Sequence, residues 1–420
     1  MTGRPDELLA RLHRDEWARL VAVLVRQFGD IELAEEAAQA AMETALVRWP
    51  DEGVPRSPSA WLLTTARRTA LDRVRRDAVY TGKLAGYALE HPASAPPAEN
   101  EAIAGLEDVF DEQLAMMMAC CHPAIGPADQ IAMMLRFAAG LTTVEVAACL
   151  LQSVPTLQAR ITRAKKRIAA NRIPIAVPRE SDALAERLDL VLSAISLIYT
   201  TGYDTPAGER VVRAELTGEA LRLARIVVGA LPEQAEAEAL LGLLLLTQAR
   251  EPARIDADGV PVALEDQERG RWDRAMIAEG TTLVERAARR PTAGRFTIQA
   301  AIAAVHAEAV SFGRTDWRQI VVLYDLLLAR GDDPVVRMNR AIAIARRDTP
   351  AAGLALLREL ESVPELERHH PFHAALALLH TEVGDIEAAR ASWERARELV
   401  DGTPQRRFIQ RRLDDLRGGR

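Results

Sequence analysis

Hydrophobic residues recur at three- and four-residue intervals along most of the chain, which is the spacing of amphipathic helices. The pattern is clearest over residues 141–168. There it predicts a short helix over 144–151 and a second helix that begins near Pro155, with a break at 152–154. The apolar faces carry Val146, Ala147 and Leu150 in the first helix and Leu157, Ile161, Ala164 and Ile168 in the second. Two short helices joined by a tight turn are typical of a helix-turn-helix.

The residues at the helix starts support this interpretation. Thr142 or Thr143 can cap the first helix. Ser153 can cap the second, with Pro155 in the first turn, where a proline is tolerated. The outward face of this second helix carries no acidic side chain.

The charge of this segment points to nucleic acid. Residues 141–172 contain one acid, Glu145, against six basic residues: Arg160, Arg163, Lys165, Lys166, Arg167 and Arg172. A polar and basic second helix suits the DNA major groove. We therefore predict DNA contacts from Pro155, Thr156, Gln158, Ala159 and Arg160 at its start, and from Thr162, Arg163 and Lys166 further along. The alternative is an ordinary helical hairpin with a solvated basic face.

The N-terminal pattern predicts one or two helices over 7–49, interrupted at residues 29–30, then a loop over 50–58 and a helix over 60–77 capped by Ser59. The helix after the interruption is acidic, with Glu32, Glu35, Glu36 and Glu43 ahead of its first basic residue, Arg48. The helix over 60–77 is basic, with Arg67, Arg68, Arg73, Arg75 and Arg76 against Asp72. The acidic face complements a basic partner surface, or is simply solvated.

Glycine and proline mark two boundaries further on. Residues 78–100 have no usable period and predict a linker, and helix resumes over 106–137. Two prolines mark a second boundary over 172–179. Helical patterns then follow one another over 183–199, 209–228, 233–249, 264–289, 294–310 and 317–329, with shorter pairs to the C-terminus.

Near the C-terminus the spacing of small and large residues is similar to that of a tetratricopeptide repeat. Leu376, Ala377, Ala389, Trp393 and Ala396 place small residues where paired helices would touch. Ala343 and Ala355 repeat the pattern 34 residues upstream, the period of that repeat. The pattern therefore predicts stacked helical repeats with a concave surface, for which a regulatory protein or peptide is the candidate partner.

Composition narrows the fold class to all-α. The 420 residues suffice for roughly two to four domains, and 4% aromatic residues with abundant alanine and leucine favour helices over sheets. We find no apolar run of transmembrane length and no signal peptide, and three cysteines make no disulfide framework, so we expect a cytoplasmic protein with no membrane partner. The net charge of -7 does not exclude DNA, because the basic residues are clustered.

The sequence indicates no metal, cofactor or enzyme active site. Cys120-Cys121-His122 lacks a second ligand pair, and the histidines at 369–380 lack the glutamate of a hydrolytic zinc motif. The acidic stretch 254–262 lacks the later ligands of a calcium loop, so we interpret it as a turn. We find neither a phosphate-binding glycine loop nor a nucleophile elbow.

Several stretches of the sequence resemble a known protein family. DIELAEEAAQAAMETAL at residues 30–46 and AWLLTTARRTALDRVRR at 60–76 are similar to region 2 of the extracytoplasmic-function group of bacterial sigma factors. The helix-turn-helix resembles their region 4, and the stretch 120–147 is similar to the region 4 of a subgroup with a long C-terminal extension. IYTTGYDTPAGE at 198–209 and TDWRQIVVLYDLLL at 315–328 look like that extension.

The resemblance implies roles for the N-terminal residues. It assigns docking on core RNA polymerase to the acidic helix, through Asp30, Glu35, Glu36 and Gln39. It assigns the minus-ten element, including a base flipped from the melted strand, to Arg67, Arg68, Asp72, Arg73, Arg75 and Arg76. The family often carries asparagine where this chain has Arg68, which leaves the single-strand contact at that position open.

The resemblance also implies an order of domains. It predicts region 2 over 1–80, a linker over 81–105, and region 4, for the minus-35 element, over 106–172. A helical extension over 180–290 and tetratricopeptide-like repeats over 291–420 follow. The expected function is a sigma factor whose partners are core RNA polymerase and promoter DNA, double-stranded and melted, and whose extension regulates it in cis. The alternatives are a helix-turn-helix regulator with a sensing repeat domain, and a repeat scaffold with no DNA role.

Overall fold

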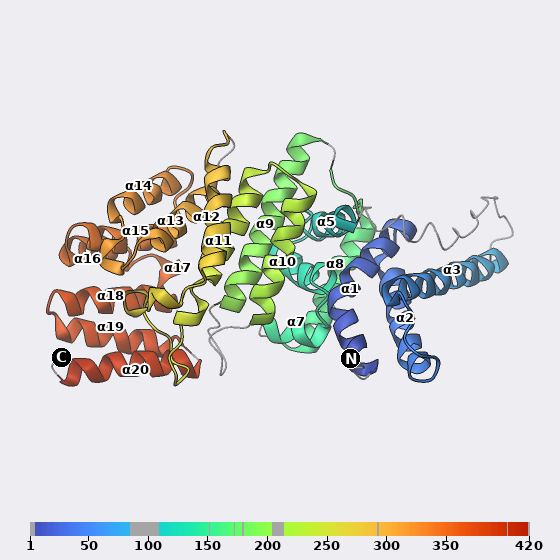
Figure 1. Cartoon of the computed structure of the whole chain (residues 1–420), viewed down its shortest axis with the longest axis horizontal. Helices are drawn as coiled ribbons and strands as arrows, with labels where there is room; N and C mark the ends of the chain where they lie inside the picture. The colour runs from blue at the N-terminus through green and yellow to red at the C-terminus, as the bar shows by residue number, and fades with distance from the viewer. Residues whose placement is uncertain are drawn as a thin grey trace. The chain divides into compact units, whose positions relative to one another are not determined.

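A computed structural model of the chain describes residues 5–84, 109–150, 152–171, 173–178, 180–203, 214–291, 294–400 and 402–418. The predicted all-α fold class is confirmed, because the described residues contain helices and no strand, apart from an isolated bridge between Ile255 and Pro261. The chain divides into two compact units, Met1–Ile198 and Tyr199–Arg420 (Figure 1). Among the described helices, none combines the length and the apolar character that crossing a membrane requires.

The first unit begins with three long helices. They are α1 (Pro5–Phe28), α2 (Ile31–Glu52) and α3 (Pro58–Leu84). Helix α2 packs against both α1 and α3, and its buried stripe consists mainly of alanines, which let neighbouring helices approach closely. Asp30 caps α2 by accepting hydrogen bonds from the amides of Glu32 and Leu33 at 2.7 and 3.1 Å.

Helices α2 and α3 differ from the predicted boundaries. Pro50 lies inside the last turn of α2, which Gly53 ends with a positive φ of 83° and a bond from its amide to the carbonyl of Trp49. The loop is therefore shorter than predicted, because a proline near a helix end removes only one main-chain hydrogen bond. Helix α3 begins at Pro58, so Ser59 lies inside it and does not cap it.

The rest of the first unit consists of shorter helices. They are α5 (Val109–Cys120), α6 (Pro127–Met133), the π-helical turn η1 (Met134–Ala138), α7 (Thr143–Cys149), α8 (Val154–Ala170) and most of α9 (Ser181–Tyr203). Both α5 and η1 pack against α1, and α6 packs against α8. Arg187 in α9 donates to the carbonyl of Met118 at 2.8 Å, so α9 is tied to α5.

The second unit is a succession of packed helices. They are α10 (Ala214–Ala230), α11 (Ala235–Gln248), α12 (Arg274–Ala288), α13 (Arg295–Glu308), α14 (Trp317–Leu328), α15 (Pro334–Arg347), α16 (Pro350–Arg358), α17 (Pro364–Glu367), α18 (His370–Glu382), α19 (Ile386–Glu398) and α20 (Thr403–Gly418). Short 3-10 turns join some of them: η2 (Glu251–Ala253), η3 (Leu264–Asp266), η4 (Arg269–Arg271) and η5 (Phe312–Arg314). The helix predicted over 264–289 starts only at Arg274, because Asp273 caps α12 through the amides of Ala275 and Met276.

The helix pairs near the C-terminus agree only in part with the repeat spacing. Ala377, Ala389 and Trp393 are buried where α18, α19 and α20 pack. In the upstream pair, the expected contact at Ala355 is wrong, because Ala355 is exposed. Gly353 makes the close approach between α15 and α16 instead.

Candidate functional site

The acidic residues predicted on α2 do not share one environment. Asp30 is the N-cap of α2, and the side chain of Gln39 donates to Glu43 at 3.0 Å. Glu36 is about half exposed and lies 3.5 Å from Arg73 of α3. Glu35 differs from the other three, because its side chain is only 17% exposed.

Glu35 is held between two cations of the same unit. One carboxylate oxygen pairs with the guanidinium of Arg136 in η1, and the other pairs with the Lys165 ammonium of α8 at 2.5 Å. Arg136 also donates to the carbonyl of Leu141 at 3.1 Å and lies over the Trp17 ring at 4.9 Å. Burial raises the pKa of the Glu35 carboxyl, but Arg136 and Lys165 overcome it and leave that pKa below its ordinary value.

Arg136 was not among the residues predicted from the sequence to be functional. Arg136 is the lone charged residue of an apolar run, IAMMLRFAAG, at residues 131–140. A charged side chain that folds into such a run needs a partner, because an unpaired buried charge is costly. The run therefore signals a buried arginine, but the identity of its partner, 101 residues away, is a matter of tertiary structure.

The start of α2 and the basic side of α8 line one cavity of about 550 Å³. Asp30 and Glu32 contribute to its lining from α2, and Thr162, Lys165 and Lys166 contribute from α8. Thr162 and Lys166, which are predicted to bind DNA, thus line the same cavity as Asp30, which is predicted to bind polymerase. In this arrangement the acidic and basic surfaces compensate each other within the unit.

Helices α7 and α8 start as predicted. The amide of Glu145 donates to the Thr142 hydroxyl at 3.2 Å, and the amide of Thr142 donates to the Glu145 carboxylate at 2.7 Å, which forms a capping box. Ser153 caps α8 through the amide of Thr156 at 3.3 Å, with Pro155 in the first turn. The predicted buried face of α8 is confirmed for Leu157, Ile161, Ala164 and Ile168.

Most of the residues predicted to contact DNA lie on the exposed side of α8. Exposed are Pro155, Thr156, Gln158, Ala159, Thr162, Arg163 and Lys166. Arg160 instead folds back onto α6, with its Nε 3.3 Å from a carboxylate oxygen of Asp129 and its Nη1 3.4 Å from the carbonyl oxygen of Ala128. Arg160 thus ties α8 to the start of α6, while the other predicted DNA contacts remain exposed. Arg172 lies outside the described residues.

The arginines of α3 form an exposed surface. Arg68, Arg73, Arg75 and Arg76 are exposed along with Asp72, whereas Arg67 is half-buried. Arg75 lies 3.9 Å from the Asp72 carboxylate, and the Arg76 side chain donates to the Asp72 carbonyl at 3.2 Å. Helix α3 continues to Leu84, four residues into the predicted linker, and residues 85–105 of that linker lie outside the described residues.

The side chains considered as metal ligands have other environments. Within the described residues, no group of three or more His, Cys, Asp or Glu side chains could hold a metal ion. Cys120 and Cys121 are buried, and burial raises the pKa of the Cys121 thiol to about 12. The Asp256 carboxylate accepts from the amides of Asp258 and Val260, each at 2.9 Å, which confirms the turn predicted there.

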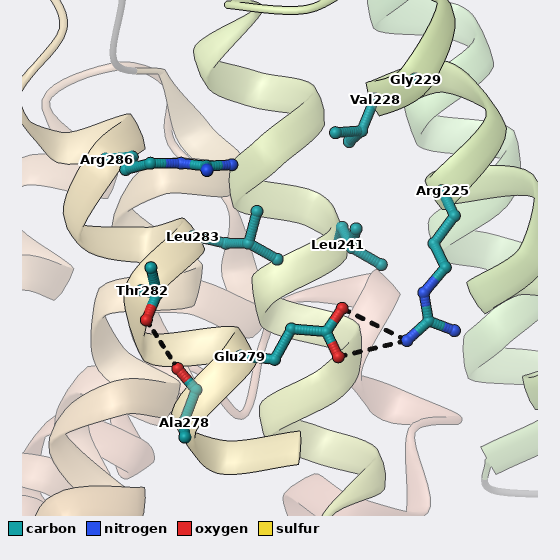
Figure 2. Close-up of a pocket in the computed structure, with 9 residues that line it drawn as sticks. All are labelled: Arg225, Val228, Gly229, Leu241, Ala278, Glu279, Thr282, Leu283 and Arg286. Carbon is teal, nitrogen blue, oxygen red and sulfur yellow. Dashed lines mark hydrogen bonds and ion pairs between the residues drawn. The ribbon is translucent and has the colours of Figure 1, made fainter. Parts of the chain in front are cut away.

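A shallow groove of about 620 Å³ lies over α10, α11 and α12 in the second unit (Figure 2). Leu241 and Leu283 form apolar parts of its lining. Its charged residues have partners in the protein: Arg225 lies 3.3 Å from Glu279 across the groove, and Arg286 lies 3.0 Å from Glu238. The groove therefore presents little uncompensated charge.

Comparison with known proteins identifies two regions and one relative. The family profile described as Sigma-70 region 2 matches residues 12–79, which fall in α1 to α3. The profile described as a family of unknown function (DUF6596) matches residues 187–288. A protein of Rhizobium meliloti (strain 1021), Uncharacterized protein R00370, is 37% identical over 398 residues, which cover 94% of this chain and 93% of that protein.

Proposed function

We propose that this chain, which belongs to the same family as the Rhizobium meliloti protein R00370 and carries a sigma-70 region 2, is a sigma factor of the extracytoplasmic-function group. It binds core RNA polymerase and directs transcription initiation at specific promoters. The observation that carries the proposal is the region 2 match, since region 2 is the part of a sigma factor that contacts core polymerase. The same match favours a sigma factor over a helix-turn-helix regulator, which needs no such region.

The acidic face of α2 is the proposed polymerase contact, through Asp30, Glu35, Glu36 and Gln39. Glu36 is available for this contact, because it is about half exposed and its partner Arg73, also about half exposed, lies 3.5 Å away. Glu35 has to exchange Arg136 and Lys165 for basic groups of the polymerase. Polymerase binding is therefore coupled to release of α8 from α2.

The basic faces of α3 and α8 are the proposed promoter contacts. The arginines of α3 contact the minus-ten element, and the exposure of Arg68, Arg73, Arg75 and Arg76 supports this role. Helices α7 and α8 form a helix-turn-helix for the minus-35 element, in which Thr156 and Gln158 face base edges and Arg163 and Lys166 face phosphates. Arg160 contributes by orienting α8, because it pairs with Asp129.

The remaining helices, from residue 180 onward, are the proposed regulatory extension. Packed helix pairs such as α15 with α16 and α18 with α19 support an assignment as tetratricopeptide-like repeats. We infer that this extension controls the sigma activity in cis and receives a regulatory protein or peptide.

Run-off transcription with core RNA polymerase tests the proposed function. Promoter-bearing templates selected from genomic DNA by the reconstituted holoenzyme should yield defined transcripts only when the chain is added to core polymerase. The control reaction contains the Glu36→Lys variant, which places a like charge against a basic polymerase surface and should abolish copurification with core polymerase. If the parent chain neither binds core polymerase nor supports any defined transcript, the proposal is wrong.

Two substitutions in α8 separate base recognition from phosphate binding. Gln158→Ala should cost about 1–3 kcal/mol on the preferred duplex and relax the preference at one base. Arg163→Ala should weaken binding to all duplexes alike. It should also reduce the dependence of the affinity on salt concentration by about the amount of one phosphate contact. Equal losses on preferred and scrambled duplexes for both variants would contradict sequence recognition by α8.

A further inference from the structure

A cavity of about 330 Å³ lies inside the second unit, between the segment 254–261 and helices α15, α18, α19 and α20. Apolar side chains such as Leu378, Trp393 and Phe408 make up most of its lining. Its size falls within the range of small-molecule sites, which are typically apolar with a few polar groups that orient the ligand.

The charged groups that line the cavity are all basic. Arg254 and Arg346 are lining residues, and no aspartate or glutamate is among the residues that line the cavity in the described part of the chain. Arg346 has two carboxylate partners, Glu382 at 2.7 Å and Glu265 at 3.7 Å. The charge of Arg346 is therefore largely compensated by the protein.

Arg254 lacks such compensation. Its Nη1 donates to the main-chain carbonyl of Tyr203 at 2.7 Å, and its guanidinium lies 3.5 Å from the centre of the Tyr203 ring. Within the described residues, no carboxylate lies at ion-pair distance from Arg254. A half-buried guanidinium that is held in place by neutral groups is a ready partner for an anion that brings its own carboxylate or phosphate.

The wall that carries Arg254 is held against the helices. Arg411 of α20 pairs with Asp256 at 2.6 Å and with Asp258 at 3.0 Å, and Arg412 pairs with Asp266 at 3.2 Å. The turn itself depends on Gly259, whose φ of 76° favours glycine. These contacts shape the cavity before any ligand arrives, which reduces the entropy lost on binding. The groove of Figure 2 offers no comparable site, because its arginines are paired with glutamates.

We propose that this cavity binds a small organic anion with an apolar body, whose body packs against Trp393 and Phe408 and whose acidic group pairs with Arg254. Binding removes apolar surface from water and neutralises the uncompensated guanidinium. The assignment concerns only the second unit. It holds or fails independently of sigma activity, since neither polymerase nor DNA is needed to observe the binding.

Calorimetric titration of the full-length chain with octanoate tests the proposal, with neutral 1-octanol as the matched ligand. The parent chain should bind octanoate at one saturable site. Arg254→Gln should bind octanoate at least about tenfold more weakly, because a charge-assisted hydrogen bond is lost, and should bind 1-octanol as the parent does. Arg358→Gln removes an exposed arginine of α16 that does not line the cavity, and should change neither affinity.

A second variant tests the cavity without altering charge. Ala374 lines the cavity, and Ala374→Leu fills part of it, so both ligands should bind more weakly. Circular dichroism and thermal unfolding establish that each variant is folded. The proposal is overturned if the parent shows no saturable octanoate binding, or if a folded Arg254→Gln or Ala374→Leu variant binds octanoate as tightly as the parent.

Discussion

Glu35 shows how a single side chain links distant parts of the first unit. Its two partners are 101 and 130 residues away in sequence, in η1 and α8. The three side chains are each at most about one-fifth exposed, so solvent screens their charges less than those of a surface pair. Removing the carboxylate would leave two cations together without an anion, a situation that is costly in partly buried sites.

We predict that Glu35→Gln lowers the free energy of unfolding by about 1.5–3 kcal/mol near neutral pH, the value of hydrogen bonds to charged groups. Because the folded pKa of Glu35 is depressed, its contribution is present above the unfolded value of about 4.3 and disappears as pH falls through the folded pKa. Urea unfolding of parent and variant from about pH 7 to about pH 3.5 should show the difference shrinking below about pH 4.5.

Glu36→Gln is the matched control at the residue scale. Glu36 and Arg73 are 3.5 Å apart and about half exposed, so this substitution should change stability by less than about 0.5 kcal/mol at any pH. Two outcomes would show that the pairing with Arg136 and Lys165 does not stabilise the fold. In one, Glu35→Gln changes the free energy of unfolding as little as Glu36→Gln does; in the other, its effect stays constant down to the lowest pH measured.

At the scale of elements, the contact between α15 and α16 depends on the absence of a side chain. A Cβ atom added at Gly353 would lie 2.4 Å from the Cβ of Ala345 and 2.7 Å from the carbonyl oxygen of Ala341. Neither atom belongs to a flexible side chain, so the helices would have to separate. Gly218 in α10 is also helical, but a Cβ there would meet nothing within 4 Å.

We predict opposite effects for the same substitution at these two glycines. Gly353→Ala should destabilise the chain by about 1–3 kcal/mol, because overpacking outweighs the better helix propensity of alanine. Gly218→Ala should stabilise it by about 0.5–1 kcal/mol, since only the propensity changes. Chemical unfolding followed by circular dichroism measures both. A stabilising Gly353→Ala would mean that α15 and α16 are not in close contact.

At the scale of the whole molecule, the two compact units set where the chain can be cut. Helix α9 belongs to the first unit through Ile198, and its Arg187 is bonded to the Met118 carbonyl. A chain that ends at Tyr203 therefore keeps this helix. A chain that ends at Pro178 loses it, and with it the bond from Arg187 to Met118 and buried apolar residues such as Val191 and Ile195.

We predict that the chain 1–203 folds and binds promoter DNA, but gives about tenfold less run-off transcript than the full-length protein, which corresponds to about 1.4 kcal/mol of coupling. The extension would then act on initiation in cis. The chain 1–178 should be less stable than 1–203 in thermal unfolding. Equal transcript from full-length and 1–203 proteins across a titration of core polymerase would show that the extension acts on something other than initiation.

The sequence by itself determined the features that depend on neighbours a few residues apart. Helical periods, the caps at Thr142 and Ser153 and the buried face of α8 follow from hydrogen bonds and side-chain contacts within one or two turns. The resemblance to sigma region 2 also rests on contiguous stretches of sequence, and the family comparison identified a sigma-70 region 2 over residues 12–79.

Only the tertiary structure decided which distant side chains meet. The partners of Glu35, the return of Arg160 to Asp129 and the bond from Arg254 to the Tyr203 carbonyl each depend on segments brought together from separate parts of the chain. The packing of α16 against α15 likewise decided that Gly353, rather than the alanine expected from repeat spacing, makes the close contact. Periodicity states which face of a helix is buried, but the choice of partner depends on how the packed helices fit and on the cost of burying an unpaired charge.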